Sequence, residues 1–163
     1  MKTIKQLLTT IAVLLCSVMA NAHDFEVDGI YYNITSTEKL TVEVTFAGDY
    51  SNYIDEYKGN ITIPSTIIYE NNVYYVIGIG KYAFEFSSIQ TITIPNNITY
   101  LKMGAFESCR SLTSIEIPNS VIFIEHGAFR NCNNLISITL SNNVTNIEYE
   151  TFKGCSSLTS ITI

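Results

Sequence analysis

The stretch from Ala105 to Leu140 reads AFESCRSLTSIEIPNSVIFIEHGAFRNCNNLISITL and contains almost the same pattern twice. An Ala-Phe pair occurs at Ala105-Phe106 and at Ala128-Phe129, and each pair is followed by a Cys, a Leu and then an Ile-x-Ile or Ile-x-Leu step. The apolar positions are kept, whereas the residues between them vary. The fixed apolar positions are therefore expected to form the core of a repeating fold, and any binding residues are expected among the variable positions.

A period of 23 residues organises the chain after Asn60. A period of about 20 to 29 residues with apolar residues at alternate positions is typical of a leucine-rich-repeat solenoid. Each coil adds a short strand that buries its apolar face only against its neighbours. The recurring columns are Ile89, Leu112, Leu135 and Leu158; Ile92, Ile115, Ile138 and Ile161; Ile94, Ile117, Leu140 and Ile163; Ile98, Val121 and Val144; Leu101, Ile124 and Ile147; and Phe84, Phe106, Phe129 and Phe152.

The segment LTSIEIPNSVIFIEHGAFRNCNN resembles the BspA-like leucine-rich repeat, found in bacterial surface and secreted proteins. The resemblance covers about half of the chain and rests on the apolar positions, on the Ile-Pro steps at Ile94-Pro95 and Ile117-Pro118, and on Ala-Phe followed by Cys. Ser141 replaces the Pro and Thr151 replaces the Ala in the later repeats, and the Cys is missing near Phe86. The resemblance implies a mainly β, right-handed solenoid with short strands on both flanks, and adhesion to host or neighbouring-cell proteins, matrix proteins among them.

Residues 1–22 have the layout of a secretory signal peptide. Two lysines precede an apolar run from Leu7 to Met19, and small residues in an A-x-A arrangement end at Ala22. The run of 13 residues is shorter than the roughly 20 that a membrane span needs. Cys16 raises the alternative of a lipidated cysteine, but Leu15 is larger than the residue such a site prefers. The sequence favours an exported protein, secreted or at the cell surface.

The chain is acidic once that segment is removed. Two of the nine basic residues and none of the fifteen acidic ones lie in the signal, so the formal charge becomes 7 − 15 = −8. Such a chain is repelled by phosphate groups, and it has no stripe of Lys and Arg. No nucleic-acid partner is predicted, nor insertion into a membrane after signal cleavage.

Residues 23–60 differ from the repeats at 61–163 and predict an N-terminal β-hairpin cap. An Asp28-Gly29 turn between alternating residues indicates a hairpin, and Leu40 to Phe46 alternates as a strand does. A solenoid needs such a cap to cover the edge of its first coil. An insertion centred on Glu70-Asn71-Asn72 interrupts the first repeat. Three tyrosines near the boundary either form a binding feature or, as we expect, pack against the cap: Tyr50, Tyr53 and Tyr57.

The C-terminal end stops inside a predicted strand at Ile163. An uncapped coil exposes an apolar core edge and a strand edge, which favours association. We expect the array to be truncated, with self-association through the uncapped coil as the alternative.

Motifs for catalysis, cofactors or metals are not found. His126 aligns with Met103 and Tyr149 and is interpreted as a surface residue. The carboxylates at Asp55-Glu56, with Asp49, lack the spacing of a calcium loop. The cysteines repeat at intervals of 23 and predict a column of buried thiols, because the paired spacing and His partners of a zinc site are absent. They are Cys109, Cys132 and Cys155.

The variable positions on the strands are the candidate ligand-binding residues. They form a ladder of hydroxyl groups with one carboxylate, followed by two aromatic side chains that are expected to be adjacent and exposed. Aromatic residues are over-represented at energetically important contacts. The first hypothesis is a binding module for proteins, and the alternative is a structural spacer that positions a domain beyond the C-terminus. The candidate residues are Tyr100, Ser114, Glu116, Phe123, Ser137 and Thr139.

Overall fold

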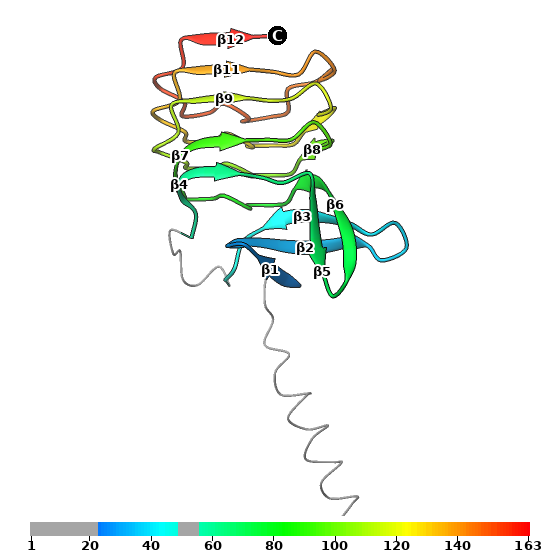
Figure 1. Ribbon diagram of the computed structural model, residues 1–163. Helices are drawn as coiled ribbons and strands as arrows, with labels where there is room; N and C mark the ends of the chain where they lie inside the picture. The colour runs from blue at the N-terminus through cyan, green and yellow to red at the C-terminus, as the bar shows by residue number, and fades with distance from the viewer. Residues whose placement is uncertain (1–22, 49–55) are drawn as a thin grey trace, which may run out of the picture.

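The computed structural model describes residues 23–48 and 56–163, which stack as successive β-coils above an N-terminal sheet (Figure 1). These residues form twelve strands and no helix. The predicted signal peptide lies outside the described residues. The strands are β1 (Phe25–Val27), β2 (Ile30–Ser36), β3 (Thr41–Thr45), β4 (Lys58–Thr62), β5 (Thr66–Tyr69), β6 (Asn72–Ile79), β7 (Ser88–Thr93), β8 (Tyr100–Leu101), β9 (Ser114–Glu116), β10 (Phe123–Ile124), β11 (Ser137–Thr139) and β12 (Ser160–Thr162).

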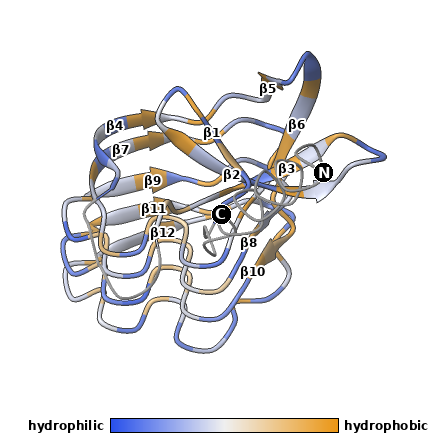
Figure 2. Ribbon diagram, turned by 90° about the horizontal axis from the view of Figure 1, so that it is seen from below, coloured by the Kyte–Doolittle hydropathy of each residue, from blue (hydrophilic) through white to orange (hydrophobic). Residues whose placement is uncertain are grey.

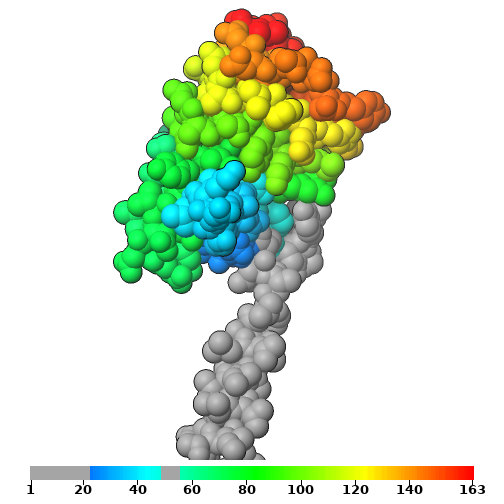
Figure 3. All heavy atoms as spheres, turned by 90° about the vertical axis from the view of Figure 1, so that its right-hand side faces the viewer, coloured from blue at the N-terminus to red at the C-terminus, as the bar shows by residue number. Residues whose placement is uncertain are grey.

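Three sheets run along the stack. One has the order β1-β2-β3-β6-β8-β10, with β5 paired to β6, and the other two have the orders β12-β11-β9 and β4-β7. The view along the stack places β4, β7, β9, β11 and β12 on one flank, and β8 and β10 on another (Figure 2). Figure 3 shows the coils as layers in sequence order.

Parallel pairing keeps equivalent repeat positions one above another. Ser137 of β11 pairs with Ser114 of β9 on one side and with Ser160 of β12 on the other. On the second flank, Tyr100 of β8 pairs with Phe123 of β10. Every outward side chain therefore lies beside the corresponding side chain of the next coil.

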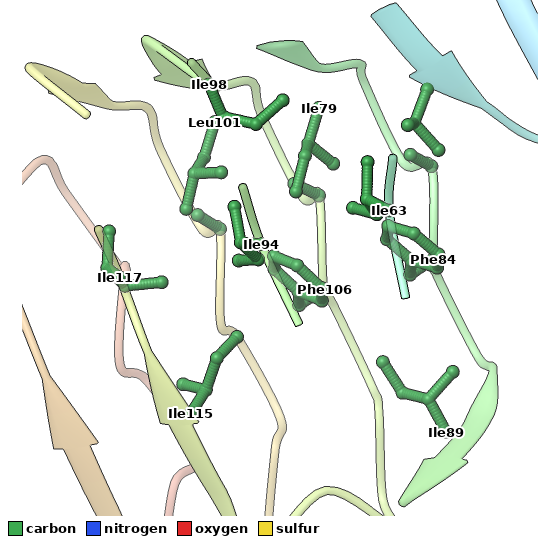
Figure 4. Packing of buried hydrophobic residues seen from close by; sticks show 14 of the residues in the cluster. Ile63, Ile79, Phe84, Ile89, Ile94, Ile98, Leu101, Phe106, Ile115 and Ile117 are labelled. Atoms are coloured by element: carbon green, nitrogen blue, oxygen red, sulfur yellow. The ribbon is translucent and has the colours of Figure 1, made fainter. Parts of the chain in front are cut away.

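The core lies between the flanks and follows the predicted apolar columns (Figure 4). Ile115 is 6% exposed, and Leu112 is fully buried. Four phenylalanines form a continuous stack, with centroid separations of 5.2, 5.3 and 5.7 Å and nearly parallel rings. Removal of this apolar surface from water is the main stabilising contribution. The stacked residues are Phe84, Phe106, Phe129 and Phe152.

The predicted column of free thiols is confirmed. Cys109 and Cys132 are buried, Cys155 is partly buried, and all three are unpaired. Each Sγ donates a hydrogen bond of 3.0 Å to the carbonyl oxygen of the phenylalanine one coil earlier. The thiols therefore satisfy backbone acceptors in the core, a role that their spacing alone does not reveal.

Two departures from the repeat pattern are accommodated by hydrogen bonds. The Ser141 hydroxyl, which stands in place of Pro, is buried and donates to the carbonyl of Val121 at 2.6 Å. The Thr151 hydroxyl, in place of Ala, donates to the carbonyl of Glu148 at 2.7 Å. Because buried hydroxyls are costly only when unpaired, both substitutions are compatible with the core.

The N-terminal sheet joins the repeats through β3, which pairs in parallel with β6. The predicted Asp28-Gly29 turn connects β1 and β2, with positive φ at both residues. The predicted alternation of the third strand is wrong, because Glu43 and Thr45 are buried as well as their apolar neighbours. The Glu43 carboxylate accepts a hydrogen bond from the Tyr100 hydroxyl at 2.9 Å and pairs with the Lys102 ammonium at 2.8 Å.

The expected packing of the boundary tyrosines is confirmed for Tyr57. It is 2% exposed, and its hydroxyl donates to the carbonyl of Thr45 at 2.6 Å. Tyr50 and Tyr53 lie outside the described residues.

The last coil of the described residues exposes its apolar repeat positions, as expected of an uncapped coil. Ile147 and Ile161 are each 50% exposed, and Ile163 is 77% exposed. Their counterparts in earlier coils are covered by a following coil, whereas no later coil of the described residues covers these. In the described part of the chain, no helix has the length and apolar character needed to cross a membrane.

Candidate ligand-binding surface

The flank formed by β7, β9, β11 and β12 carries a ladder of small polar side chains. Ser114, Glu116 and Thr139 are exposed, and Ser137 is partly exposed. Ile115 and Ile138 lie between them and point into the core. Four of the six predicted residues are therefore brought together on one flank. The complete ladder is Thr91, Thr93, Ser114, Glu116, Ser137, Thr139, Ser160 and Thr162.

A shallow hollow of about 270 Å³ lies beside this ladder. Glu116 lines it from one coil, and Thr93 and Asn96 line it from the preceding coil. Sequence reasoning identified Glu116 but not the hollow, because Asn96 follows the strand in a turn. The surface offers hydroxyl, amide and carboxylate groups, which can bind polar groups of a ligand. Its remaining lining residues are Ile92, Ile94 and Pro118.

Tyr100 and Phe123 lie on a different flank, in the seven-stranded sheet. The six predicted residues thus form two separate groups. Phe123 is 63% exposed, as expected. The expectation that Tyr100 is also an exposed aromatic is wrong, because it is only partly exposed.

The burial of Tyr100 depends on its register partner in the preceding coil, Gly78, and on Glu43 of the N-terminal sheet. A Cβ at Gly78 would lie 2.0 Å from Cε2 of the Tyr100 ring, so the ring occupies space that only glycine leaves. The hydroxyl donates to buried Glu43. Burial, and then the Glu43 carboxylate, raise the pKa of Tyr100 above its ordinary value. Tyr100 is primarily a structural contact between the N-terminal sheet and the first coils.

A column of charged side chains follows the stacked phenylalanines, and it combines like and opposite charges. Glu85, Glu107, Arg130 and Lys153 each come directly after a phenylalanine of the stack. Arg130 lies 3.6 Å from the Glu107 carboxylate and 3.3 Å from that of Glu150. At the start of this column, burial and then the neighbouring carboxylate of Glu107 raise the pKa of Glu85 to about 7.

This raised pKa predicts a loss of stability as the pH rises from about 4.5 to about 7. In this range the folded state binds more protons than the unfolded state, whose Glu85 titrates near 4.5, so the free energy of unfolding falls with rising pH. Allowing for solvent screening of a partly exposed group, we expect Glu85→Gln to stabilise the protein by about 1 kcal/mol at pH 8 and to have no effect at about pH 3, below the pKa of both states. Urea unfolding at both pH values measures this difference.

The matched control for this prediction is Glu116→Gln, which changes an exposed carboxylate on the strand ladder. It is expected to leave the stability unchanged at both pH values. A Glu85→Gln effect of the same size at pH 3 and pH 8 would contradict the titration of Glu85.

The remaining residues considered from the sequence, the acidic residues near Glu56 and the imidazole of His126, are not expected to bind a metal or to act in catalysis. In the described residues, no group of three or more His, Cys, Asp and Glu side chains could hold a metal ion. The Glu56 carboxylate accepts hydrogen bonds from the amides of Ala47 and Gly48 at 2.7 and 3.1 Å, whereas Asp49 and Asp55 lie outside the described residues. The His126 ring is partly exposed and stacks on that of Tyr149 at 5.4 Å.

Comparison with known proteins places these features in a repeat family. Residues 77–163 match the BspA type leucine rich repeat region in six copies. No protein with a curated description matches the chain.

Several solved structures are similar. A leucine-rich repeat protein from Bacteroides ovatus is 30% identical, with a TM-score of 0.65, and the match covers 86% of this chain and 41% of that one. A leucine-rich repeat protein from Bacteroides capillosus is 24% identical with a TM-score of 0.70, over 85% of this chain and 96% of that one. A leucine rich cell surface protein from Faecalibacterium prausnitzii is 22% identical with a TM-score of 0.59, over 85% and 42%. The chain therefore spans less than half of two of these proteins.

Proposed function

The chain belongs to the BspA-type leucine-rich-repeat family, and from this premise we propose that it is a non-enzymatic bacterial repeat protein that binds protein ligands outside the cell. The observation that carries the proposal is the ladder of exposed polar side chains on strands stacked in register. A flat, regular surface of this kind on a rigid core is suited to an extended protein partner. Matrix proteins and proteins of host or neighbouring cells are the proposed partner class, and no cofactor is required.

The primary contact surface in this proposal is the flank that carries Ser114, Glu116, Ser137 and Thr139. Parallel strands lie about 4.8 Å apart, so these side chains present hydrogen-bonding groups at a regular spacing. Phe123, with the exposed part of Tyr100, is proposed as a secondary contact on the other flank. Its exposed ring supports this assignment, since exposed aromatic residues often contribute strongly to protein interfaces.

The proposal also covers the arrangement of the coils and the export of the protein from the cell. We propose a right-handed solenoid of 23-residue coils over residues 61–163, capped by residues 23–60; pairings between residues 23 apart, such as Ser114 with Ser137, support the coil length. Export is supported by the signal-like composition of residues 1–22 and by a similar fold in a protein described as a cell surface protein. The exposed Ile161 and Ile163 support self-association at the last coil.

The test compares two forms of the protein obtained by expressing the full chain. The first is unchanged, and the second carries Ser114→Ala, Glu116→Ala, Ser137→Ala and Thr139→Ala. Both are titrated against a panel of immobilised matrix proteins and surface glycans. We expect saturable binding to a protein of the panel, weakened at least about tenfold in the variant, because several contacts of an interface are removed together.

Thermal unfolding of the variant is the control, since exposed substitutions change stability by only about 0.5 kcal/mol. Binding that survives in the folded variant would exclude the ladder as the contact surface. No binding by either form would favour the alternative role of a spacer that positions another domain.

A further inference from the structure

A groove of about 130 Å³ lies on the flank of β8 and β10, between the coil of β10 and the coil that follows it. The polar ladder lies on the other flank. Phe123 is 63% exposed and Ile122 44% exposed, so the groove has an apolar wall that faces solvent. Figure 2 shows β10 as a hydrophobic segment at the surface of its flank. The following coil contributes Thr145 and Asn146, and the two coils contribute one carboxylate each, from Glu125 and Glu148.

The preceding coil shows how a cation is held at the equivalent place. The Lys102 ammonium lies 5.4 Å from the centroid of the Tyr100 ring and pairs with the Glu43 carboxylate at 2.8 Å. One coil later, Phe123 pairs in register with Tyr100, and Glu125 takes the repeat position of Lys102, since 125 − 102 = 23. The aromatic ring is therefore kept, whereas the cation is replaced by a carboxylate.

The described part of the chain supplies no cation to this groove. Its ion pairs involve Glu43, Glu107 and Glu150, and neither Glu125 nor Glu148 has a Lys or Arg nitrogen within 4.0 Å. Lys102, on the neighbouring coil, is already engaged by Glu43. The two carboxylates come from adjacent coils and line the same groove, so a cation between them is favourable. The formal charge of −8, without the signal, also attracts a cationic ligand from a distance.

One of the two carboxylates is held in place before any ligand binds. Oε2 of Glu125 accepts a hydrogen bond from the backbone amide of Met103 at 2.9 Å, which fixes the side chain and leaves Oε1 available. A carboxylate held in this way loses less conformational freedom on binding than a free one. The groove therefore combines an exposed aromatic face, an aliphatic wall and oriented negative charge.

We propose that this groove receives a Lys or Arg side chain from an extended, basic segment of the protein ligand. The aliphatic stem packs on Ile122 and Phe123, and the cationic head lies between Glu125 and Glu148. Cationic side chains commonly bury their stems on apolar surface while the charged head stays hydrated, and they are attracted to aromatic faces. This inference rests on the proposed function for the protein nature of the ligand, and it adds a specific chemistry to a flank separate from the polar ladder.

The test uses a blocked peptide that alternates Lys and Thr, so that an extended conformation presents its lysines on one side. Amide NMR of the full chain, titrated with this peptide, reports both affinity and location. We expect saturable shifts at Phe123, Thr145 and Asn146, and weakening at 0.5 M salt, because exposed charge pairs are screened. Glu125→Gln with Glu148→Gln is expected to weaken binding about fivefold, as is Phe123→Ala.

The glutamine at position 125 can still accept the Met103 amide, so the fold is preserved in the double variant. Glu38→Gln, which changes an exposed carboxylate in the turn between β2 and β3, is the matched control and is expected to have no effect. Equal binding by the wild type and the double variant would overturn the inference, and so would equal binding of a peptide alternating Glu and Thr. If the ladder variant loses a matrix ligand while the Lys-Thr peptide binds nowhere, this inference fails and the proposed function stands.

Discussion

Replacing Ile115 with Asp is expected to unfold the repeat array. Ile115 is 6% exposed at the centre of β9, between Ile138 of the next coil and Ile92 of the previous one. Loss of a buried aliphatic side chain costs about 2 to 5 kcal/mol, and an unpaired buried carboxylate adds several more. This sum is comparable with the entire stability of a typical domain, about 5 to 15 kcal/mol. Circular dichroism during heating should show no cooperative transition at neutral pH.

The matched control is Thr139→Ala on the adjacent strand. Thr139 is exposed and pairs through its backbone with Glu116 and Thr162, so its strand hydrogen bonds are kept. The expected change in the free energy of unfolding is about 0.5 kcal/mol or less. Equal tolerance of Ile115→Asp and Thr139→Ala would mean that the strand faces are assigned the wrong way round.

The fold could be predicted from sequence to the extent that it follows the repeat. A column such as Leu112 and Leu135 has the same surroundings in every coil, so the period alone indicates that both are buried. The same holds for the alternation of Ser114, Ile115 and Glu116, in which only the middle residue faces the core. Regular neighbours make these positions predictable from local pattern.

Positions that depend on non-repeating neighbours could not be predicted. Tyr100 takes the same repeat position as Phe123, but it is covered because Gly78 of the preceding coil has no side chain and because Glu43 comes from the N-terminal sheet, outside the repeat. The same limit applies to the groove at Phe123. Its charge depends on a repeat position that is Lys102 in one coil and Glu125 in the next.

The backbone repeats a left-handed conformation at one position of each coil, although different residue types occupy that position. The residue two positions before each phenylalanine has a positive φ, between 56° and 64°, in all four coils. Gly104 and Gly127 adopt this conformation without strain, whereas Tyr82 and Glu150 adopt it at a cost. The sequence indicates this turn only at the two glycines.

The second large effect is expected for Phe106→Ala, because Phe106 lies between two other rings. It is fully buried and stacks on Phe84 at 5.2 Å and on Phe129 at 5.3 Å. Truncation of a buried phenylalanine costs about 3 to 5 kcal/mol, and each aromatic contact contributes about 0.5 to 1.5 kcal/mol beyond burial. We expect a loss near the upper end of that range, measured by urea unfolding.

Phe152→Ala is the matched comparison, because this phenylalanine at the end of the stack has one ring neighbour among the described residues, Phe129 at 5.7 Å, and is partly exposed. Each coil of a solenoid is stabilised mainly by its nearest neighbours, so an end position loses about half of the contacts of a central one. The expected cost is about 1 to 2 kcal/mol. Equal losses for the two variants would show that stability is not transmitted coil by coil through the phenylalanine stack. A larger loss for Phe106→Ala ties the repeating phenylalanine directly to the cohesion of the array, on which the regular spacing of the outer ladder depends.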